Sequence, residues 1–210
     1  MIKKVLKENK LWLIVLLIVI ILFSIIMQSN IYDKIVLFDY KVFNIIQKII
    51  DNKLTFIFKV LTNFGDLYIP CVILVCILLF IKNKWYFILQ SAGYLTSGLI
   101  AYLLKIIIAR ERPLEALIKI PRSFSFPSGH TLTSIVFYGL LCYLLTYKKE
   151  KNIKIIGIII TSLLIISIAV SRVYLGVHYF SDVIGGLILG IIILKIIINI
   201  IEKNFKEKLK

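Results

Sequence analysis

Three clusters of polar residues interrupt a chain that is otherwise rich in aliphatic side chains. They contain the only two histidines of the sequence, together with arginines, a lysine and an aspartate. Their members are Lys105, Arg112 and Pro113; Pro127, Ser128, Gly129 and His130; and Ser171, Arg172, His178 and Asp182. Imidazoles, a carboxylate and several positive charges are the groups that hold a phosphate and attack its phosphorus atom. The sequence therefore indicates phosphoryl chemistry.

The first cluster pairs two long basic side chains. Lys105 and Arg112 are seven residues apart. On a helix they project from nearly the same face, about 10 Å apart along the axis, so both can reach one dianion. Pro113 ends such a helix. Taken alone, the cluster is equally typical of a basic helix end at a membrane surface.

The second cluster precedes an apolar run and has the composition of a helix start. Ser128 is expected as the N-cap, and Gly129 leaves room for a ligand beside free backbone N–H groups, which bind anions. His130 then lies in the first turn, next to a bound phosphate. The alternative is a capped helix start with an incidental histidine.

The third cluster offers an activated histidine. Asp182 follows His178 by one helical turn, so its carboxylate can accept a hydrogen bond from the imidazole. This bond fixes the tautomer and leaves the other ring nitrogen as a nucleophile. Arg172 supplies a planar fork suited to phosphate oxygens. The alternative is a structural histidine–aspartate pair at a helix end.

Composition places these clusters in a membrane protein. The chain has 210 residues, 60% of them hydrophobic, whereas soluble domains average about 45–50%. Several apolar runs approach the roughly 20 residues that cross a bilayer. We expect an all-α fold, a bundle of six transmembrane helices forming a single domain over residues 1–210. The predicted spans are 11–28, 65–82, 85–109, 129–147, 153–172 and 181–201.

Two segments carry further structural information. In residues 34–63, apolar positions recur at helical spacing among polar residues, which predicts one or two amphipathic helices in the membrane interface between the first and second spans. In the third span, small residues and one lysine recur every fourth position: Gly93, Ser97, Ala101, Lys105 and Ala109. Such a stripe faces other helices, so Lys105 should point into the bundle.

The net charge of +15 comes from 26 basic and 11 acidic residues. Most lysines flank the apolar runs, a pattern that sets membrane orientation and gives no support to nucleic-acid binding. It predicts a multi-pass protein of the cell membrane with both termini in the cytoplasm and the three clusters on the outer face. The three cysteines lie in apolar segments without the spacing of disulfide or metal sites.

Together the clusters resemble the signature of the type 2 phosphatidic acid phosphatases, relatives of the vanadium haloperoxidases. That signature reads Lys-x6-Arg-Pro, Pro-Ser-Gly-His and Ser-Arg-x5-His-x3-Asp, and every position matches across residues 105–182. Many members continue the first motif with a second Arg-Pro, where this chain has Leu114-Glu115. The resemblance implies a six-helix membrane-embedded lipid phosphatase, similar to the small bacterial members, that needs no metal or other cofactor.

The resemblance also implies a two-step mechanism. His178 attacks phosphorus to give a phosphohistidine, and His130 protonates the departing oxygen and then activates water. Asp182 orients His178. The charge on the phosphate oxygens is stabilised by the remaining residues of the clusters, namely Lys105, Arg112, Ser128, Gly129 and Arg172.

The substrate is expected to be a lipid phosphate that enters from the membrane. Undecaprenyl pyrophosphate is the first choice, because the site should face outward, and phosphatidylglycerophosphate and phosphatidic acid also fit. Two other functions stay open from the sequence. One is a phosphotransferase that passes the phosphoryl group between lipids, and the other is a non-catalytic transporter that binds a phosphate lipid. The sequence makes no prediction of oligomeric state.

Overall fold

The computed structural model describes residue 7 and residues 9–209. These residues form eight α-helices and one short 3-10 helix, and they contain no strand, which confirms the all-helical prediction. In chain order the elements are α2 (Lys10–Met27), α3 (Ile31–Gln47), α4 (Asn52–Asn63), α5 (Tyr68–Phe80), α6 (Trp85–Ile108), α7 (Gly129–Thr146), α8 (Lys151–Tyr174), α9 (Phe180–Asn204) and η1 (Lys206–Leu209).

Five of the described helices, α2, α6, α7, α8 and α9, are long and apolar enough to cross a membrane. The predicted span 65–82 is too long, because residues 64–67 form a turn and α5 has only 13 residues. A crossing takes about 20 residues. α4 and α5 meet this requirement only as a pair, bent by 44°. The chain therefore has five candidate spans, or six if the bent pair counts as one.

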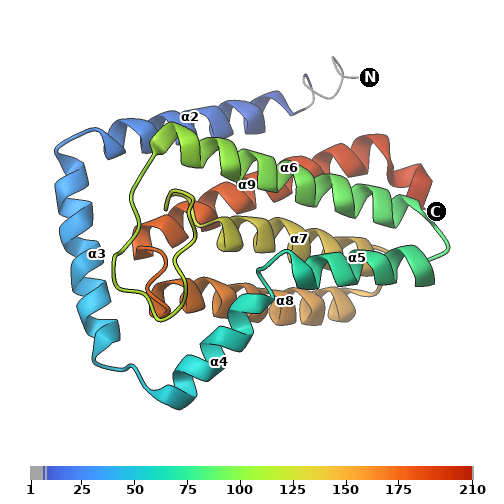
Figure 1. The fold of residues 1–210 in the computed structure, drawn as a ribbon. Helices are drawn as coiled ribbons and strands as arrows, with labels where there is room; N and C mark the ends of the chain where they lie inside the picture. The colour runs from blue at the N-terminus through green and yellow to red at the C-terminus, as the bar shows by residue number, and fades with distance from the viewer. Residues whose placement is uncertain (1–6, 8, 210) are drawn as a thin grey trace.

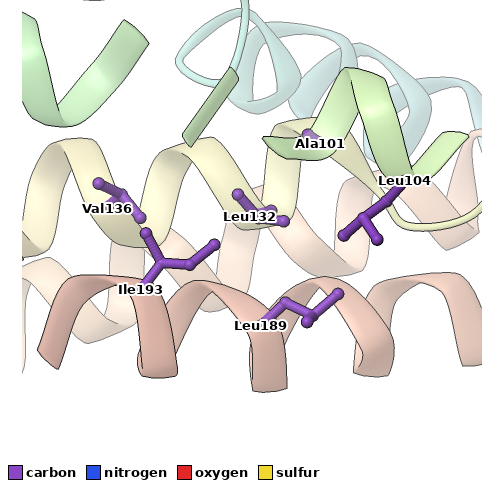
Figure 2. Packing of buried hydrophobic residues seen from close by; sticks show 6 residues of the cluster. All are labelled: Ala101, Leu104, Leu132, Val136, Leu189 and Ile193. Carbon is purple, nitrogen blue, oxygen red and sulfur yellow. The ribbon is translucent and has the colours of Figure 1, made fainter. Parts of the chain in front are cut away.

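α7 lies at the centre of the bundle and packs against α6, α8 and α9. Figure 2 shows one part of this core, where apolar side chains of three helices meet. These residues are Ala101 and Leu104 of α6, Leu132 and Val136 of α7, and Leu189 and Ile193 of α9. Close packing of α9 on α7 requires Gly190, since a Cβ there would lie 2.9 Å from Ile135 Cδ1.

The stripe of small residues on α6 does face the bundle, as its spacing predicts. Ala109 does not belong to the stripe, because α6 ends at Ile108 and Ala109 follows it with φ of 49°. The other four residues, Gly93, Ser97, Ala101 and Lys105, are all buried. Lys105 is thereby carried to the end of α6 on the side of the neighbouring helices. The packing of α6 thus places the Lys105 ammonium group inside the bundle rather than on its surface.

The segment predicted as amphipathic forms two helices, α3 and α4. In Figure 1, α3 (blue) lies across one end of the bundle, and α4 (cyan) runs obliquely to it. The loop between α6 and α7, residues 109–128, covers the same end. These three segments therefore surround the ends of α6, α7, α8 and α9 at which the polar clusters lie.

The lysine-rich segments gather at the opposite end (Figure 1). The α5–α6 link contacts the C-terminal segment through Asn83, whose Nδ2 donates to the Lys208 carbonyl at 2.8 Å. The end of α7 contacts it through Tyr147, whose hydroxyl donates to the Leu209 carbonyl at 3.3 Å. The predicted cytoplasmic residues Lys3, Lys4 and Lys210 lie outside the described residues. The described basic segments thus share one end, separate from the clusters.

Candidate active site

All eight predicted site residues lie at the end of the bundle covered by the α6–α7 loop. His178 sits in the turn between α8 and α9. Its backbone N–H and that of Val177 both donate to the Arg172 carbonyl, at 3.3 and 3.2 Å. Gly176 has φ of +70° in this turn, which favours glycine. This tight turn places His178 of the third cluster in contact with Arg112 of the first.

The imidazole of His178 is held between opposite charges. Its Nδ1 lies 3.5 Å from Asp182 Oδ2, and its Nε2 lies 3.1 Å from Arg112 Nη1. A guanidinium only donates hydrogen bonds, so Nε2 must be the unprotonated acceptor and Nδ1 must carry the proton. Arg112 thus selects the tautomer whose Nε2 lone pair is available.

Burial also keeps this imidazole neutral. The His178 side chain is 2% exposed, and desolvation lowers its pKa to about 3 despite the nearby Asp182 carboxylate. At neutral pH the ring therefore carries no proton on Nε2. A neutral imidazole beside a cationic guanidinium is suited to attack an anion.

Asp182 is fully buried and accepts hydrogen bonds at both oxygens. Oδ2 accepts from the Ser125 hydroxyl at 2.5 Å and from the Tyr179 N–H at 2.9 Å. Oδ1 accepts from Arg110 Nη1 at 2.6 Å. The sequence singled out neither Ser125 nor Arg110. Both lie within or beside the clusters, but nothing in their spacing distinguishes them from their neighbours.

Lys105 binds the backbone of the segment that leads into α7. Its Nζ donates to the carbonyls of Phe124 at 2.6 Å, Ser125 at 3.1 Å and Pro127 at 2.9 Å. A Cβ added at Gly129 would lie 3.7 Å from Lys105 Cε, so the lysine and the first residue of α7 are neighbours. The first two clusters therefore meet, with the ammonium group close to a helix N-terminus.

The expected helix through Arg112 to Pro113 was wrong, because α6 ends at Ile108 and Arg112 lies in the α6–α7 loop. There it ties the loop to the turn that carries His178. Its Nε donates to the Ser123 carbonyl at 2.7 Å, and its Nη1 donates to the Val177 carbonyl at 2.6 Å. Burial lowers the pKa of Arg112 from its usual value. The guanidinium is half-buried yet stays charged, so it presents a positive charge directly in front of His178 Nε2.

The start of α7 differs in one respect from the prediction. Ser128 occupies the N-cap position, but its side chain caps no N–H of the helix. Its hydroxyl instead accepts a hydrogen bond from Thr131 Oγ1 at 3.0 Å, because Ser128 is fully buried against α9. The expected side-chain cap was wrong. The helix start nevertheless keeps its positive partial charge for an anion.

His130 and Arg172 are held by a segment that the sequence did not connect with the site. His130 Nε2 lies 2.8 Å from Asp66 Oδ1, in the turn between α4 and α5. Arg172 Nη1 donates to Thr62 Oγ1 at 2.5 Å at the end of α4. Asp66 and Thr62 belong to no motif, so only the fold identifies them. Asp66 brings a carboxylate to the second histidine, as Asp182 does for the first.

The charges of the site favour an anionic ligand. Lys105, Arg112 and Arg172 surround two histidines, and the two site carboxylates each pair with a histidine. Among the described residues, no group of three or more histidines, cysteines or acidic residues is arranged to hold a metal ion. The arrangement can therefore bind a phosphate dianion beside His178 through basic side chains and backbone dipoles.

Curated relatives of known activity share this part of the chain. Over 137 residues it is 35% identical to phosphatidylglycerophosphatase B of Bacillus subtilis strain 168, covering 62% of this chain and 63% of that protein. An undecaprenyl-diphosphatase of Sulfolobus acidocaldarius is 32% identical over 136 residues, covering 62% of each chain. The chain thus spans just under two thirds of the length of these relatives.

The fold and a family model agree with these relatives. The structure superposes on the crystal structure of the first transmembrane PAP2-type phosphatidylglycerolphosphate phosphatase from Bacillus subtilis with a TM-score of 0.79. That match has 27% sequence identity and covers 94% of this chain and 96% of the other. Residues 85–206, which contain all three clusters, match the model of the PAP2 superfamily. The family suggested by the three clusters is confirmed, and the chain belongs to the PAP2 superfamily.

Proposed function

We propose that this protein is a membrane lipid phosphatase that removes phosphate from a lipid phosphomonoester or pyrophosphate through a phosphohistidine at His178. One observation carries the proposal. His178 is neutral and buried, with Nδ1 facing the Asp182 carboxylate and Nε2 facing the Arg112 guanidinium. This arrangement places the lone pair of His178 Nε2 beside the Arg112 guanidinium, a cation suited to binding phosphate.

In the first step, His178 Nε2 forms a bond to phosphorus while the bond from phosphorus to the lipid oxygen breaks. The departing oxygen takes a proton from His130, whose Nε2 lies 2.8 Å from Asp66 Oδ1. In the second step, His130 takes a proton from water as the water oxygen attacks phosphorus. The N–P bond then breaks, inorganic phosphate leaves, and both histidines return to their starting states.

The phosphate must displace Arg112 from its direct contact with His178. Arg112 keeps three carbonyl partners, Ser123, Phe124 and Val177, so its guanidinium can shift onto a phosphate oxygen without leaving the site. Lys105, Arg172 and the start of α7 complete the positive surroundings. Groups fixed in this way stabilise the charge that develops on the equatorial oxygens without reorganising during the reaction.

The substrate class follows from the surroundings of the site. Exposed apolar side chains line α3 and α4 beside it, including Leu37, Phe38 and Phe56. They suit a lipid whose chains stay in the membrane while its phosphate reaches the bundle end. Undecaprenyl pyrophosphate is our first choice on the predicted outward orientation. Phosphatidylglycerophosphate is the second, since relatives with that activity share the fold.

A phosphate-release panel on purified protein in detergent tests the proposal. Polyprenyl pyrophosphates, phosphatidylglycerophosphate and phosphatidic acid are offered separately, with and without EDTA. We expect phosphate release from at least one lipid without an acceptor, and no loss of rate in EDTA. Release only when an acceptor lipid is added would indicate a phosphotransferase. Binding without release would indicate a transporter, and loss in EDTA with rescue by a divalent ion would contradict the metal-free mechanism.

A further inference from the structure

α3 contributes one buried side chain to the protein, and that side chain is charged. All residues of α3 are described, and Asp39 alone among them is buried, at 1% exposure. Its neighbours Leu37 and Phe38 are exposed. Burying a carboxylate is costly unless it is paired and hydrogen-bonded. α3 lies outside the residues 85–206 that match the family model, so its role is separate from the three clusters.

Asp39 binds the first turn of α9. Its Oδ1 accepts a hydrogen bond from the Ser181 N–H at 2.9 Å, and its Oδ2 accepts from the Ser181 hydroxyl at 2.5 Å. The first N–H groups of a helix have no partner within the helix, and a negative charge near them is favourable. A carboxylate from α3 therefore satisfies the end of α9 that carries Asp182.

Arg110 connects Asp39 to Asp182. Its Nη2 lies 2.7 Å from Asp39 Oδ2, and its Nη1 lies 2.6 Å from Asp182 Oδ1. The guanidinium also stacks on the Tyr179 ring, 4.2 Å from its centroid. Burial lowers the pKa of Arg110, but Asp182 and Asp39 outweigh this effect and raise it above its usual value, so the charge persists.

Arg110 differs from Arg112 in what its nitrogens do. Both terminal nitrogens of Arg110 bind carboxylates, and the residue is 4% exposed. It cannot bind a phosphate without releasing Asp39 or Asp182. Arg110 also holds only Oδ1 of Asp182, which leaves Oδ2 to face His178 Nδ1. Arg110 at Oδ1 therefore acts together with the Ser125 hydroxyl and the Tyr179 N–H at Oδ2 to fix the rotation of the carboxylate.

We propose that Asp39 and Arg110 are positioning residues, through which α3 fixes the orientation of Asp182 and thereby that of the His178 nucleophile. The proposal rests on the phosphatase function proposed above. It gives α3 a defined role in turnover: Val42 and Ile46 pack on the bundle, and the single buried charge of the helix supports the site.

The first test compares three variants of the full chain in detergent, on a lipid that the wild type hydrolyses. Asp39→Ala should lower kcat by roughly 10- to 100-fold, the range typical of removing an outer group that orients a metal-ligating histidine. KM should stay within about twofold, because no phosphate contact is lost. Asp39→Asn should lose less, because its amide oxygen still accepts a hydrogen bond. Asp33→Ala, which removes an exposed carboxylate of the same helix, should behave like the wild type.

The second test asks whether Asp39 acts through Arg110. If it does, Asp39→Ala combined with Arg110→Met should be no slower than Arg110→Met alone. A general loss of packing would instead multiply the two losses. Should Asp39→Ala fail to fold, the same cycle is run with Asp39→Asn, and size-exclusion profiles establish that each variant is folded.

Three results would overturn the proposal: wild-type kcat in Asp39→Ala, a change in KM alone, or multiplied losses in the double variant. These failures differ from failure of the proposed function. If the wild type released no phosphate from any lipid, both would fall. If the wild type turns over and Asp39→Ala does so equally well, only the positioning role is wrong.

Discussion

Arg112 connects the α6–α7 loop with the turn between α8 and α9 that carries His178. It reaches the His178 ring with Nη1 and the Ser123 and Val177 carbonyls with its other bonds. A lysine has a single point of charge and no planar fork, so it cannot hold both the loop and a phosphate oxygen. The guanidinium is therefore a structural tie, and in the proposed mechanism it is also a ligand for the phosphate.

We predict that Arg112→Lys lowers kcat/KM by about 100-fold or more, as expected when one fixed donor to the transition state is removed. Phosphate release on the best lipid of the panel measures this. The control is Arg122→Lys, an arginine of the same loop that is exposed and belongs to none of the clusters. Equal activity of both variants would remove Arg112 from the site.

Among single residues, the sequence identified the members of the three clusters but not the aspartates outside the clusters that contact them or their neighbours in the chain. His178, Asp182, Arg112 and Lys105 follow from residue type and spacing. Asp39 and Asp66 do not, because their partners are far away in the chain: Asp39 binds Ser181, 142 residues later. An isolated aspartate in an amphipathic segment has no periodicity that reveals such a partner. Only the placement of α3 and the α4–α5 turn on the bundle end discloses it.

Among the elements, the turn between α8 and α9 sets the geometry of the nucleophile. Gly176 takes a left-handed conformation there, and the Glu115 carbonyl of the α6–α7 loop packs directly against its α-carbon. The backbone of that loop is also bonded to the turn, since the Leu117 N–H donates to the Leu175 carbonyl at 3.0 Å. Loop and turn thus support each other without any side chain at position 176.

Gly176→Ala should therefore destabilise the fold by about 1–3 kcal/mol, the usual cost of a left-handed non-glycine residue. Displacement of the loop should lower activity as well. Thermal unfolding in detergent, together with phosphate release, measures both effects. The matched control is Gly98→Ala in α6, where an added Cβ meets nothing within 4 Å and alanine is the better helix former. A stable, fully active Gly176→Ala would show that the tight turn is not required.

The elements themselves were largely predictable where long apolar runs define them. α2, α6, α7, α8 and α9 begin and end within a few residues of the predicted spans. α5 was not predictable in this way. The predicted span starts at Gly65, but residues 64–67 form a turn, in which a Cβ added at Gly65 would lie 2.8 Å from His130 Cδ2. Hydropathy carries no information about such a contact.

For the whole molecule, the placement of the lysine-rich links between the spans bears on the orientation in the membrane. The described lysine-rich links and the C-terminal segment lie at one end, and the three clusters lie at the other (Figure 1). Basic segments are retained in the cytoplasm during membrane insertion. We therefore propose that the site faces outward, where a lipid carrier is left after its cargo has been transferred.

Single cysteines in a background without Cys71, Cys76 and Cys142 test this orientation in intact cells. Leu114, which is 93% exposed in the α6–α7 loop, should react as a cysteine with an impermeant thiol reagent from outside. Asn152, exposed among the lysines at the start of α8, should react only after permeabilisation. The reverse pattern would place the site in the cytoplasm and remove the support for an outer-leaflet substrate.

The central claim is that His178 carries the phosphoryl group, and trapping that intermediate tests it most directly. Purified protein is mixed with a lipid bearing radioactive terminal phosphate, stopped in alkali and digested. We expect a label that is stable in alkali, labile in acid and confined to the peptide containing His178. His178→Ala should show neither label nor turnover, although it folds. Turnover in His178→Ala, or a label on any other residue, would contradict the account.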